Sequence, residues 1–196
     1  MSQEVEIEFK TRLTSKQYAK LMTDYNLTEQ DCFTQTNNYF DTPDHLLKKQ
    51  KMGLRIRLLP TEAELTLKSP LVTGYGLLET TDKLTLTEAK DLIDEDNILL
   101  TGNVATYLKD LGIDPIKLTS FGQLTTKRAE VALTPDNLLV LDESWYHGQH
   151  DFELEMEVKN AESGKAFFVN FLNRHGIPYS PTKNKIERTF AAKMAE

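Results

Sequence analysis

The sequence has a single cysteine, no long apolar run and no excess of basic residues. One cysteine, Cys32, excludes an intramolecular disulfide framework and any metal site built from several thiolates. No apolar stretch approaches the length of a membrane-spanning helix, and the first ten residues lack the basic and then apolar pattern of a secretory signal. We therefore expect a cytoplasmic protein with no membrane partner.

Basic residues are outnumbered by acidic ones, 23 Lys and Arg against 30 Asp and Glu, which gives a formal net charge of −7. Broad nucleic-acid binding is disfavoured because it needs a dominant basic field, although a local basic pocket is compatible with this charge. Glycine and proline are scattered, and no fixed-period repeat interrupts the chain. We expect one globular domain over residues 1–196.

Alternation of apolar and polar residues, typical of half-buried strands, recurs along the chain. It is clearest in Glu4–Lys10, where four charged residues share one face and three apolar residues the other. The full pattern predicts eight or nine strands, over residues 4–10, 33–41, 53–58, 64–68, 77–84, 121–133, 138–143, 152–158 and 186–191.

Helical spacing of apolar residues predicts four helices. The first follows Ser15 as its N-cap, and the others cover residues 87–93, 104–111 and a segment from about Ser163 to Gly176. The basic run Lys48–Lys51 fits either a solvated turn before Gly53 or a patch that steers anions.

The alternating strands fit two arrangements. In a sandwich, the apolar faces point inward and the charged faces meet water, and this is the commoner outcome. In a closed barrel, the charged faces can instead line an interior that binds a polar ligand, while helices cover the apolar exterior. Periodicity alone leaves both arrangements open.

Charge types on the strands bear on this choice. Residues two apart on a strand share a face about 6.6 Å apart, so Glu6 neighbours Glu8, and Glu153 neighbours Glu155. Two carboxylates about 4 Å apart repel by about 4 kcal/mol at an effective dielectric of 20, so enclosing them requires cations. Mg²⁺ and Mn²⁺ prefer such oxygen ligands, while Arg and Lys bind phosphate oxygens.

Several segments together resemble one family. Glu6-Ile7-Glu8-Phe9-Lys10 is similar to the ExExK signature of the CYTH, or triphosphate tunnel metalloenzyme, superfamily. Tyr39–Pro43, Leu54–Arg57 and Leu65–Lys68 resemble the next strands of that family, and the resemblance continues in order to Arg188. It implies an α+β fold in which an eight-stranded antiparallel β-barrel forms a tunnel open at both ends, with helices packed on the outside.

The resemblance also implies roles for particular residues. Metal ligands would be Glu6, Glu8, Asp142, Glu153 and Glu155, with Glu157 competing for one position. The catalytic phosphate clamp would be Lys10, Arg55, Arg57, Lys68 and Arg128. Substrate binding would further involve Glu79 and a C-terminal lysine, either Lys183 or Lys185.

These residues suggest hydrolysis of inorganic triphosphate or a small organic triphosphate with Mg²⁺ or Mn²⁺ as cofactor. Two alternatives are a polyphosphate- or nucleotide-binding module without catalysis, and an adenylate cyclase of the same superfamily. The expected partner is the small-molecule triphosphate, with no nucleic acid, and the protein is expected to be a monomer or homodimer.

Overall fold

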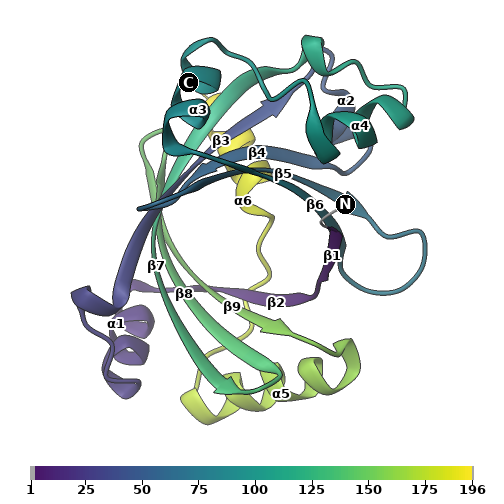
Figure 1. The fold of residues 1–196 in the computed structure, drawn as a ribbon. Coiled ribbons are helices and arrows are strands. Elements are labelled where there is room, and N and C mark those ends of the chain that lie inside the picture. Colours follow the sequence, from purple (N-terminus) through teal and green to yellow (C-terminus); the bar gives the residue numbers. More distant parts are fainter. Residues whose placement is uncertain (1–2, 196) are drawn as a thin grey trace.

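A computed structural model describes residues 3–195, which form one nine-stranded antiparallel sheet and six α-helices (Figure 1). The strand order is β1-β6-β5-β4-β3-β7-β8-β9-β2. The strands are β1 Gln3–Glu6, β2 Glu8–Leu13, β3 Cys32–Asp41, β4 Gly53–Leu58, β5 Ala63–Pro70, β6 Leu77–Leu84, β7 Thr119–Thr134, β8 Asn137–Tyr146 and β9 Gln149–Val158. The helices are α1 Ser15–Asp24, α2 Leu46–Lys49, α3 Leu86–Asp94, α4 Gly102–Asp110, α5 Ala161–His175 and α6 Lys185–Lys193.

The predicted first strand is divided at Ile7, and this division shapes the whole sheet. Before Ile7, β1 pairs with β6; after it, β2 pairs with β9. The two outer strands are therefore consecutive in the chain, and the sheet curls so that its two edges come near each other without pairing. The Ile7 carbonyl also accepts a hydrogen bond from the Val158 N–H at 2.9 Å.

The prediction of a closed eight-stranded barrel is therefore wrong in strand number and in closure. Among residues 3–195, no ladder of hydrogen bonds joins β1 to β2, so the structure is a curled nine-stranded sheet. The loop from β5 to β6 packs against the backbone at the break between β1 and β2. Gly76 has a φ of +105°, and a Cβ there would lie 2.3 Å from the Glu6 carbonyl oxygen, so this position requires glycine.

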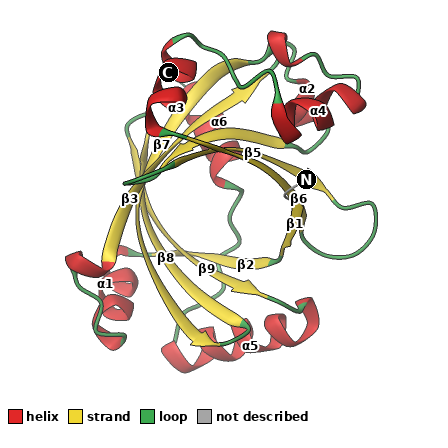
Figure 2. Cartoon of the chain, viewed as in Figure 1, coloured by secondary structure: helices red, strands yellow, loops and turns green. Residues whose placement is uncertain are grey.

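The apolar strand faces point outward and are covered by helices, as the tunnel arrangement predicts and a sandwich would not. Helices α2, α3 and α4 cover one apolar cluster, on β3 to β6, and α1 and α5 cover another, on β2, β8 and β9 (Figure 2). Thr14 and Thr85 form capping boxes at the starts of α1 and α3, so Thr14 rather than the predicted Ser15 caps the first helix. None of the helices in residues 3–195 is long and apolar enough to cross a membrane.

The predicted strand over residues 186–191 is instead helix α6. Asn184 and Glu187 form a capping box at its start, and Ile186 and Phe190 lie four residues apart on the same side. The helix packs on the concave side of the sheet, where Ile186 joins a small cluster with Tyr39 and Leu124 (Figure 1). The prediction that the helices pack outside is thus wrong for α6.

Candidate functional site

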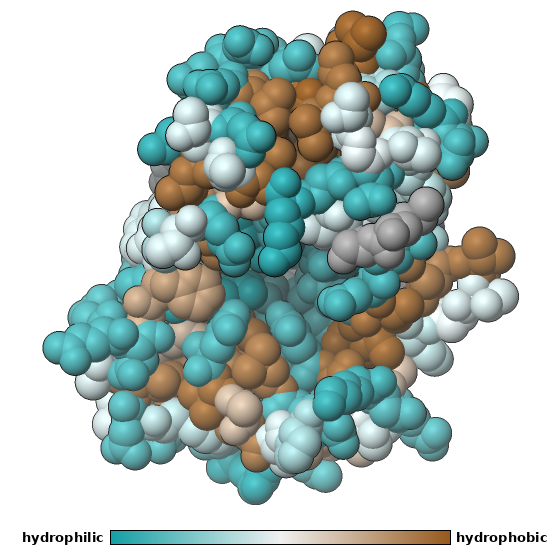
Figure 3. All heavy atoms as spheres, viewed as in Figure 1, coloured by the Kyte–Doolittle hydropathy of each residue, from teal (hydrophilic) through white to brown (hydrophobic). Residues whose placement is uncertain are grey.

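A cavity of about 1000 Å³ lies inside the curl, and hydrophilic residues gather around the hollow where it opens to the viewer (Figure 3). The strand alternation directs the charged side chains into it, since every second residue of a strand faces the same way. Ten of the thirteen predicted site residues line the cavity: Glu6, Glu8, Lys10, Arg55, Arg57, Lys68, Glu79, Arg128, Glu155 and Lys185. The other three, Asp142, Glu153 and Lys183, are not among its lining residues.

One side of the cavity, which we call the basic wall, is formed by Arg55 and Arg57 of β4 and Lys68 of β5. The two guanidinium groups share one carboxylate, Glu64, at N–O distances of 3.9 and 3.5 Å. Arg55 Nε is buried without a hydrogen-bond partner in the described part of the chain. Burial, together with the charges of Arg55 and Arg128, lowers the pKa of Arg57 to about 10. Arg55 and Arg57 therefore carry positive charge that Glu64 neutralises only in part.

A second side, which we call the acidic wall, is formed by Glu8 near the division of the first strand and by Glu155 and Glu157 of β9. Glu6 joins it to the basic wall, because Glu6 pairs with Lys68. Glu8 pairs in register with Glu157 across β2 and β9. Burial is the main cause that raises the pKa of Glu157 to about 7, and the charges of Glu6 and Glu155 add to it. The nearest cation to Glu157, Arg128, is 4.0 Å away. The ionised form of Glu157 is thus disfavoured, because no close cation compensates it.

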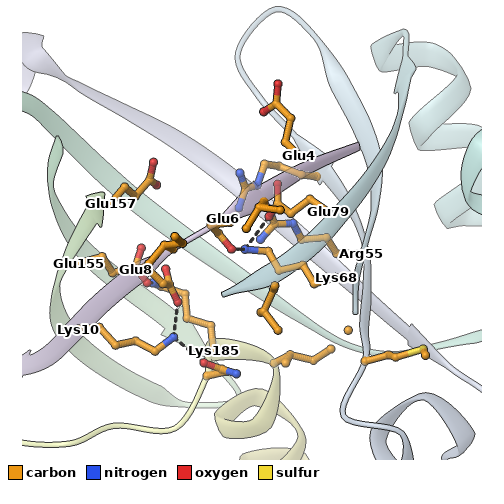
Figure 4. A pocket seen from close by; sticks show the side chains of 18 of the residues that line it. Glu4, Glu6, Glu8, Lys10, Arg55, Lys68, Glu79, Glu155, Glu157 and Lys185 are labelled. Atoms are coloured by element: carbon orange, nitrogen blue, oxygen red, sulfur yellow. Dashed lines mark hydrogen bonds and ion pairs between the residues drawn. The ribbon is translucent and has the colours of Figure 1, made fainter. Parts of the chain in front are cut away.

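Two lysines link carboxylates around the cavity (Figure 4). Lys68 forms ion pairs with Glu6 and, at 2.7 Å, with Glu79. Lys10 lies 2.5 Å from Glu8 and donates a hydrogen bond to Asn184 Oδ1 at the start of α6. Although burial opposes it, the charge of Glu8 raises the pKa of Lys10. Lys10 therefore stays protonated at neutral pH.

Behind the cavity surface lies a buried cluster of ion pairs. Arg128 donates two hydrogen bonds to Asp142, at 2.8 and 2.7 Å, and one to Glu155 at 2.8 Å. Lys185 Nζ lies 2.7 Å from Asp142, 3.1 Å from Glu153 and 2.5 Å from Glu155. Burial disfavours ionised Glu155, but Lys185 and Arg128 outweigh it and hold its pKa well below the usual range. Asp142 and Glu153 act here as fully buried counterions.

The C-terminal segment brings one of the two predicted lysines to the cavity and an arginine close to it. Lys185 points into the cavity (Figure 4), whereas Lys183 is exposed. Arg188, one turn further along α6, donates to Glu153 at 2.5 Å and to the Lys183 carbonyl at 2.6 Å. The sequence interpretation missed Arg188 because it placed this segment in a strand, although the three-residue spacing from Lys185 is helical.

The residues present fit a hard divalent cation. Among residues 3–195, no three carboxylate, histidine or cysteine side chains converge as a preformed metal cage. Mg²⁺ commonly needs only one or two carboxylates, because waters and substrate phosphates supply its other ligands. A bound cation would compensate an ionised Glu157, which lacks a close cation, and Glu6 and Glu8 line the same cavity as Glu157.

A curled antiparallel sheet that encloses basic and acidic walls is the architecture of the triphosphate tunnel class of proteins. The CYTH domain model matches residues 4–190 of the sequence, and the chain belongs to the CYTH family.

Full-length relatives agree with this assignment. The chain is 40% identical over 193 residues to a Bacillus subtilis protein named "Putative triphosphatase YjbK", and the match covers 98% of each. A solved structure described as a "putative adenylate cyclase" from Bacillus halodurans is 37% identical, with a TM-score of 0.90, over 97% of this chain and 100% of that one. The Hippeastrum protein HpAC1 shares the fold, with 22% identity and a TM-score of 0.74 over 95% of both chains.

Proposed function

We propose that this protein is a divalent-metal-dependent triphosphatase that hydrolyses the terminal phosphoanhydride bond of a triphosphate. The observation that carries the proposal is the presence of a basic and an acidic wall within one cavity of about 1000 Å³. The incompletely neutralised guanidinium groups of Arg55 and Arg57 suit a polyanion, and Glu157, which lacks a close cation, suits a metal ion. A metal-bound triphosphate carries both charges.

The basic residues would bind and orient the substrate. Arg55 and Arg57 present forked donors that match two phosphate oxygens each, while Lys10 and Lys68 act as compact point charges. By surrounding the chain of phosphates, they would stabilise the charge that develops on the leaving diphosphate. A water oxygen forms the new bond to the terminal phosphorus as the bridging P–O bond breaks, which yields orthophosphate and diphosphate. No covalent nucleophile is required.

The acidic wall would hold the metal. The candidate ligands are Glu6, Glu8, Glu155 and Glu157. Where such a carboxylate is paired with a lysine or arginine, the metal ion would replace that side chain as its partner. When bound, Mg²⁺ or Mn²⁺ supplies neutralisation of phosphate oxygens and activation of water. The name of the Bacillus subtilis relative, which is 40% identical over its full length, supports this reaction.

Replacement of a carboxylate that is a candidate metal ligand tests the proposal. We expect Glu6→Gln and Glu8→Gln each to reduce Mg²⁺- or Mn²⁺-dependent phosphate release from inorganic triphosphate by at least about 10²-fold, because each removes a charge that attracts the cation. Phosphate release would be measured across a panel of inorganic triphosphate, longer polyphosphate, ATP and thiamine triphosphate, with Mg²⁺, Mn²⁺ and Ca²⁺.

The control variant is Glu62→Gln, which removes an exposed carboxylate in the turn between β4 and β5. It should retain the activity of the wild-type protein. Full activity of both Glu6→Gln and Glu8→Gln would contradict the proposal. Thermal stabilisation of the wild-type protein by triphosphates without phosphate release would favour the binding module instead.

Adenylate cyclisation is the second candidate, and the 37% identical Bacillus halodurans structure described as a putative adenylate cyclase favours it. The same phosphate contacts would serve both reactions, and only the nucleophile would differ. Cyclic AMP formation from ATP, measured in the same assays, separates them, since hydrolysis produces none.

A further inference from the structure

Helix α6 brings a buried cation to the cavity from the C-terminal part of the chain. The chain reaches this helix from α5 through residues 176–184, which contain no helix or strand (Figure 1). The first turn then presents Lys185 to the cavity, where its ammonium group lies 2.5 Å from Glu155. Because α6 has only nine residues, the place of Lys185 in the site depends on what holds this short helix to the sheet.

A buried carboxylate outside the cavity, Asp151 of β9, lies at the centre of the polar contacts that hold α6. Its Oδ2 atom accepts a hydrogen bond from the Tyr146 hydroxyl at 2.5 Å and forms an ion pair with Arg12 of β2. Arg188 Nε of α6 lies 3.4 Å from the same oxygen. The Asp151 side chain is 2% exposed and that of Arg188 is 9% exposed. Strands β2 and β8 and helix α6 therefore converge on one carboxylate.

Arg188 connects Asp151 to the site. Neither residue lines the cavity, so any effect on a substrate must pass through a side chain that does. Arg188 donates to one oxygen of Glu153 at 2.5 Å, and Lys185 lies 3.1 Å from the other. Side chains three apart on a helix are neighbours on its surface. The contacts of Arg188 therefore fix the rotation of α6 about its axis, and with it the direction of Lys185.

The Asp151–Arg188 pair is buried but incompletely hydrogen-bonded. Within residues 3–195, Asp151 Oδ1 and Arg188 Nε and Nη2 are buried without a hydrogen-bond partner. A buried guanidinium that loses one carboxylate is drawn to the next, since an uncompensated buried charge is costly. If Asp151 were uncharged, Arg188 would therefore compete with Lys185 for Glu153.

We propose that Asp151 is a positioning residue, which acts through Arg188 to fix α6 so that the Lys185 ammonium group enters the cavity. This inference rests on the proposed function and adds to it a residue that contacts neither substrate nor metal. Loss of the Asp151 charge should shift α6 rather than release it, because Ile186 still packs with Tyr39 and Leu124.

A double-mutant cycle tests whether Asp151 acts through Lys185. Asp151→Asn keeps the shape of the side chain and removes its charge. In the wild-type background, it should lower kcat/KM for inorganic triphosphate by about tenfold, because a small misplacement of a binding group is costly to the rate. In Lys185→Gln, the same change should lower kcat/KM by about twofold or less, since the lysine that Asp151 positions is then absent.

The matched control is Asp82→Asn, which changes a buried aspartate that holds a different helix. Asp82 of β6 is 9% exposed and accepts hydrogen bonds from the backbone N–H groups of Asn103 and Val104 at 2.8 Å, at the start of α4. Its substitution should reduce the free energy of unfolding and leave kcat/KM unchanged. The control thus separates a general loss of stability from the misplacement of Lys185.

Three results would overturn the inference: an equal fall of kcat/KM in both backgrounds, no fall in folded Asp151→Asn, or an equal fall in Asp82→Asn. If Asp151→Asn does not fold by circular dichroism, Tyr146→Phe decides by the same criterion. This variant removes only the hydroxyl that donates to Asp151, and we expect a fall of about threefold that is lost in Lys185→Gln.

Failure of the proposed function would give a distinct result, because the wild-type protein would then release no phosphate from inorganic triphosphate. In that case, or if Lys185→Gln releases none, the Kd of inorganic triphosphate measured by titration calorimetry replaces kcat/KM in the same cycle. A rise in Kd on Asp151→Asn that is equal in both backgrounds would still overturn the inference.

Discussion

Charged residues around the cavity arise from the same strand alternation, but they are neutralised to different degrees: the pair Arg55 and Arg57 differs from Glu155. Arg55 and Arg57 face a single carboxylate, Glu64, at 3.5 Å or more. By contrast, Glu155 lies within 2.8 Å of both Arg128 and Lys185. Close ion pairs offset the desolvation cost of burying their charges. Loosely paired groups keep a charge that a ligand can neutralise. The comparison separates residues needed for folding from residues needed for binding.

The largest expected effect comes from breaking the close pairs. Arg128→Ala should lower the free energy of unfolding by about 3–5 kcal/mol, because Asp142 and Glu155 would stay buried with Lys185 as their remaining close cation. Urea unfolding followed by the fluorescence of the single tryptophan, Trp145, measures this loss.

The neighbouring residue provides the matched control. Lys127 pairs with Glu29 and Glu143 at 2.9 and 3.2 Å, and Glu29 is 80% exposed. Solvent screens such pairs, so Lys127→Ala should cost less than about 1 kcal/mol. If Arg128→Ala and Lys127→Ala lowered the free energy of unfolding equally, the expectation that buried ion pairs matter more than exposed ones would be contradicted.

The next effect comes from the loosely paired arginines. Arg57→Gln should reduce kcat/KM for triphosphate hydrolysis by about 10²- to 10³-fold, since it removes a preorganised donor to the phosphates. Its melting temperature should change little, because burial and the charges of Arg55 and Arg128 already disfavour this cation, as its lowered pKa indicates. Steady-state kinetics and thermal unfolding measure the two quantities. Lys90→Gln, an exposed change on α3, should alter neither, and a large stability loss in Arg57→Gln would contradict the comparison.

The smallest effect is a pH dependence at Glu157. Its pKa is raised in the folded protein from the usual 4.5 to about 7, so the folded state holds a proton that the unfolded state releases. The contribution of the Glu157 carboxyl group to the free energy of unfolding is therefore greatest below pH 4.5, and it is lost as the pH rises through 7. Glu157→Gln should be more stable than the wild-type protein at pH 8, by about 1 kcal/mol after solvent screening of a 36% exposed side chain.

Urea unfolding at pH 5 and pH 8 measures the difference between Glu157→Gln and the wild-type protein. Mg²⁺ should shrink it at pH 8, because a bound cation neutralises the same carboxylate. Glu162→Gln, at an exposed position on α5, is the control and should show no such dependence. A difference of the same size at both pH values would contradict the raised pKa.

Local patterns predicted most of the secondary structure. The predicted strand over residues 77–84 coincides with β6, and Gly176, with a φ of +63°, ends α5 where the sequence placed its stop. The division at Ile7 was not predictable from alternation. Both halves of that segment direct their glutamates into the cavity, and only their pairing to opposite edges of the sheet separates them.

The C-terminal segment shows how one misassigned element hides site residues. The strand signal over residues 186–191 is weak and rests on β-branched and aromatic residues such as Ile186 and Phe190, whereas the capping pair Asn184 and Glu187 favours a helix. Recognising that pair would have placed Arg188 on the same helix face as Lys185, beside Glu153.

The sequence by itself determined which residues share a strand face and which of them carry charge, because side-chain parity follows from the extended backbone. It also carried the family resemblance, through motifs such as Glu6-Ile7-Glu8-Phe9-Lys10. The tertiary structure decided that the charged faces point inward, since parity is identical in a sandwich and a curled sheet. It also decided which charges are neutralised, because that depends on contacts such as Lys185 with Asp142, which are remote in sequence and meet only when the sheet curls.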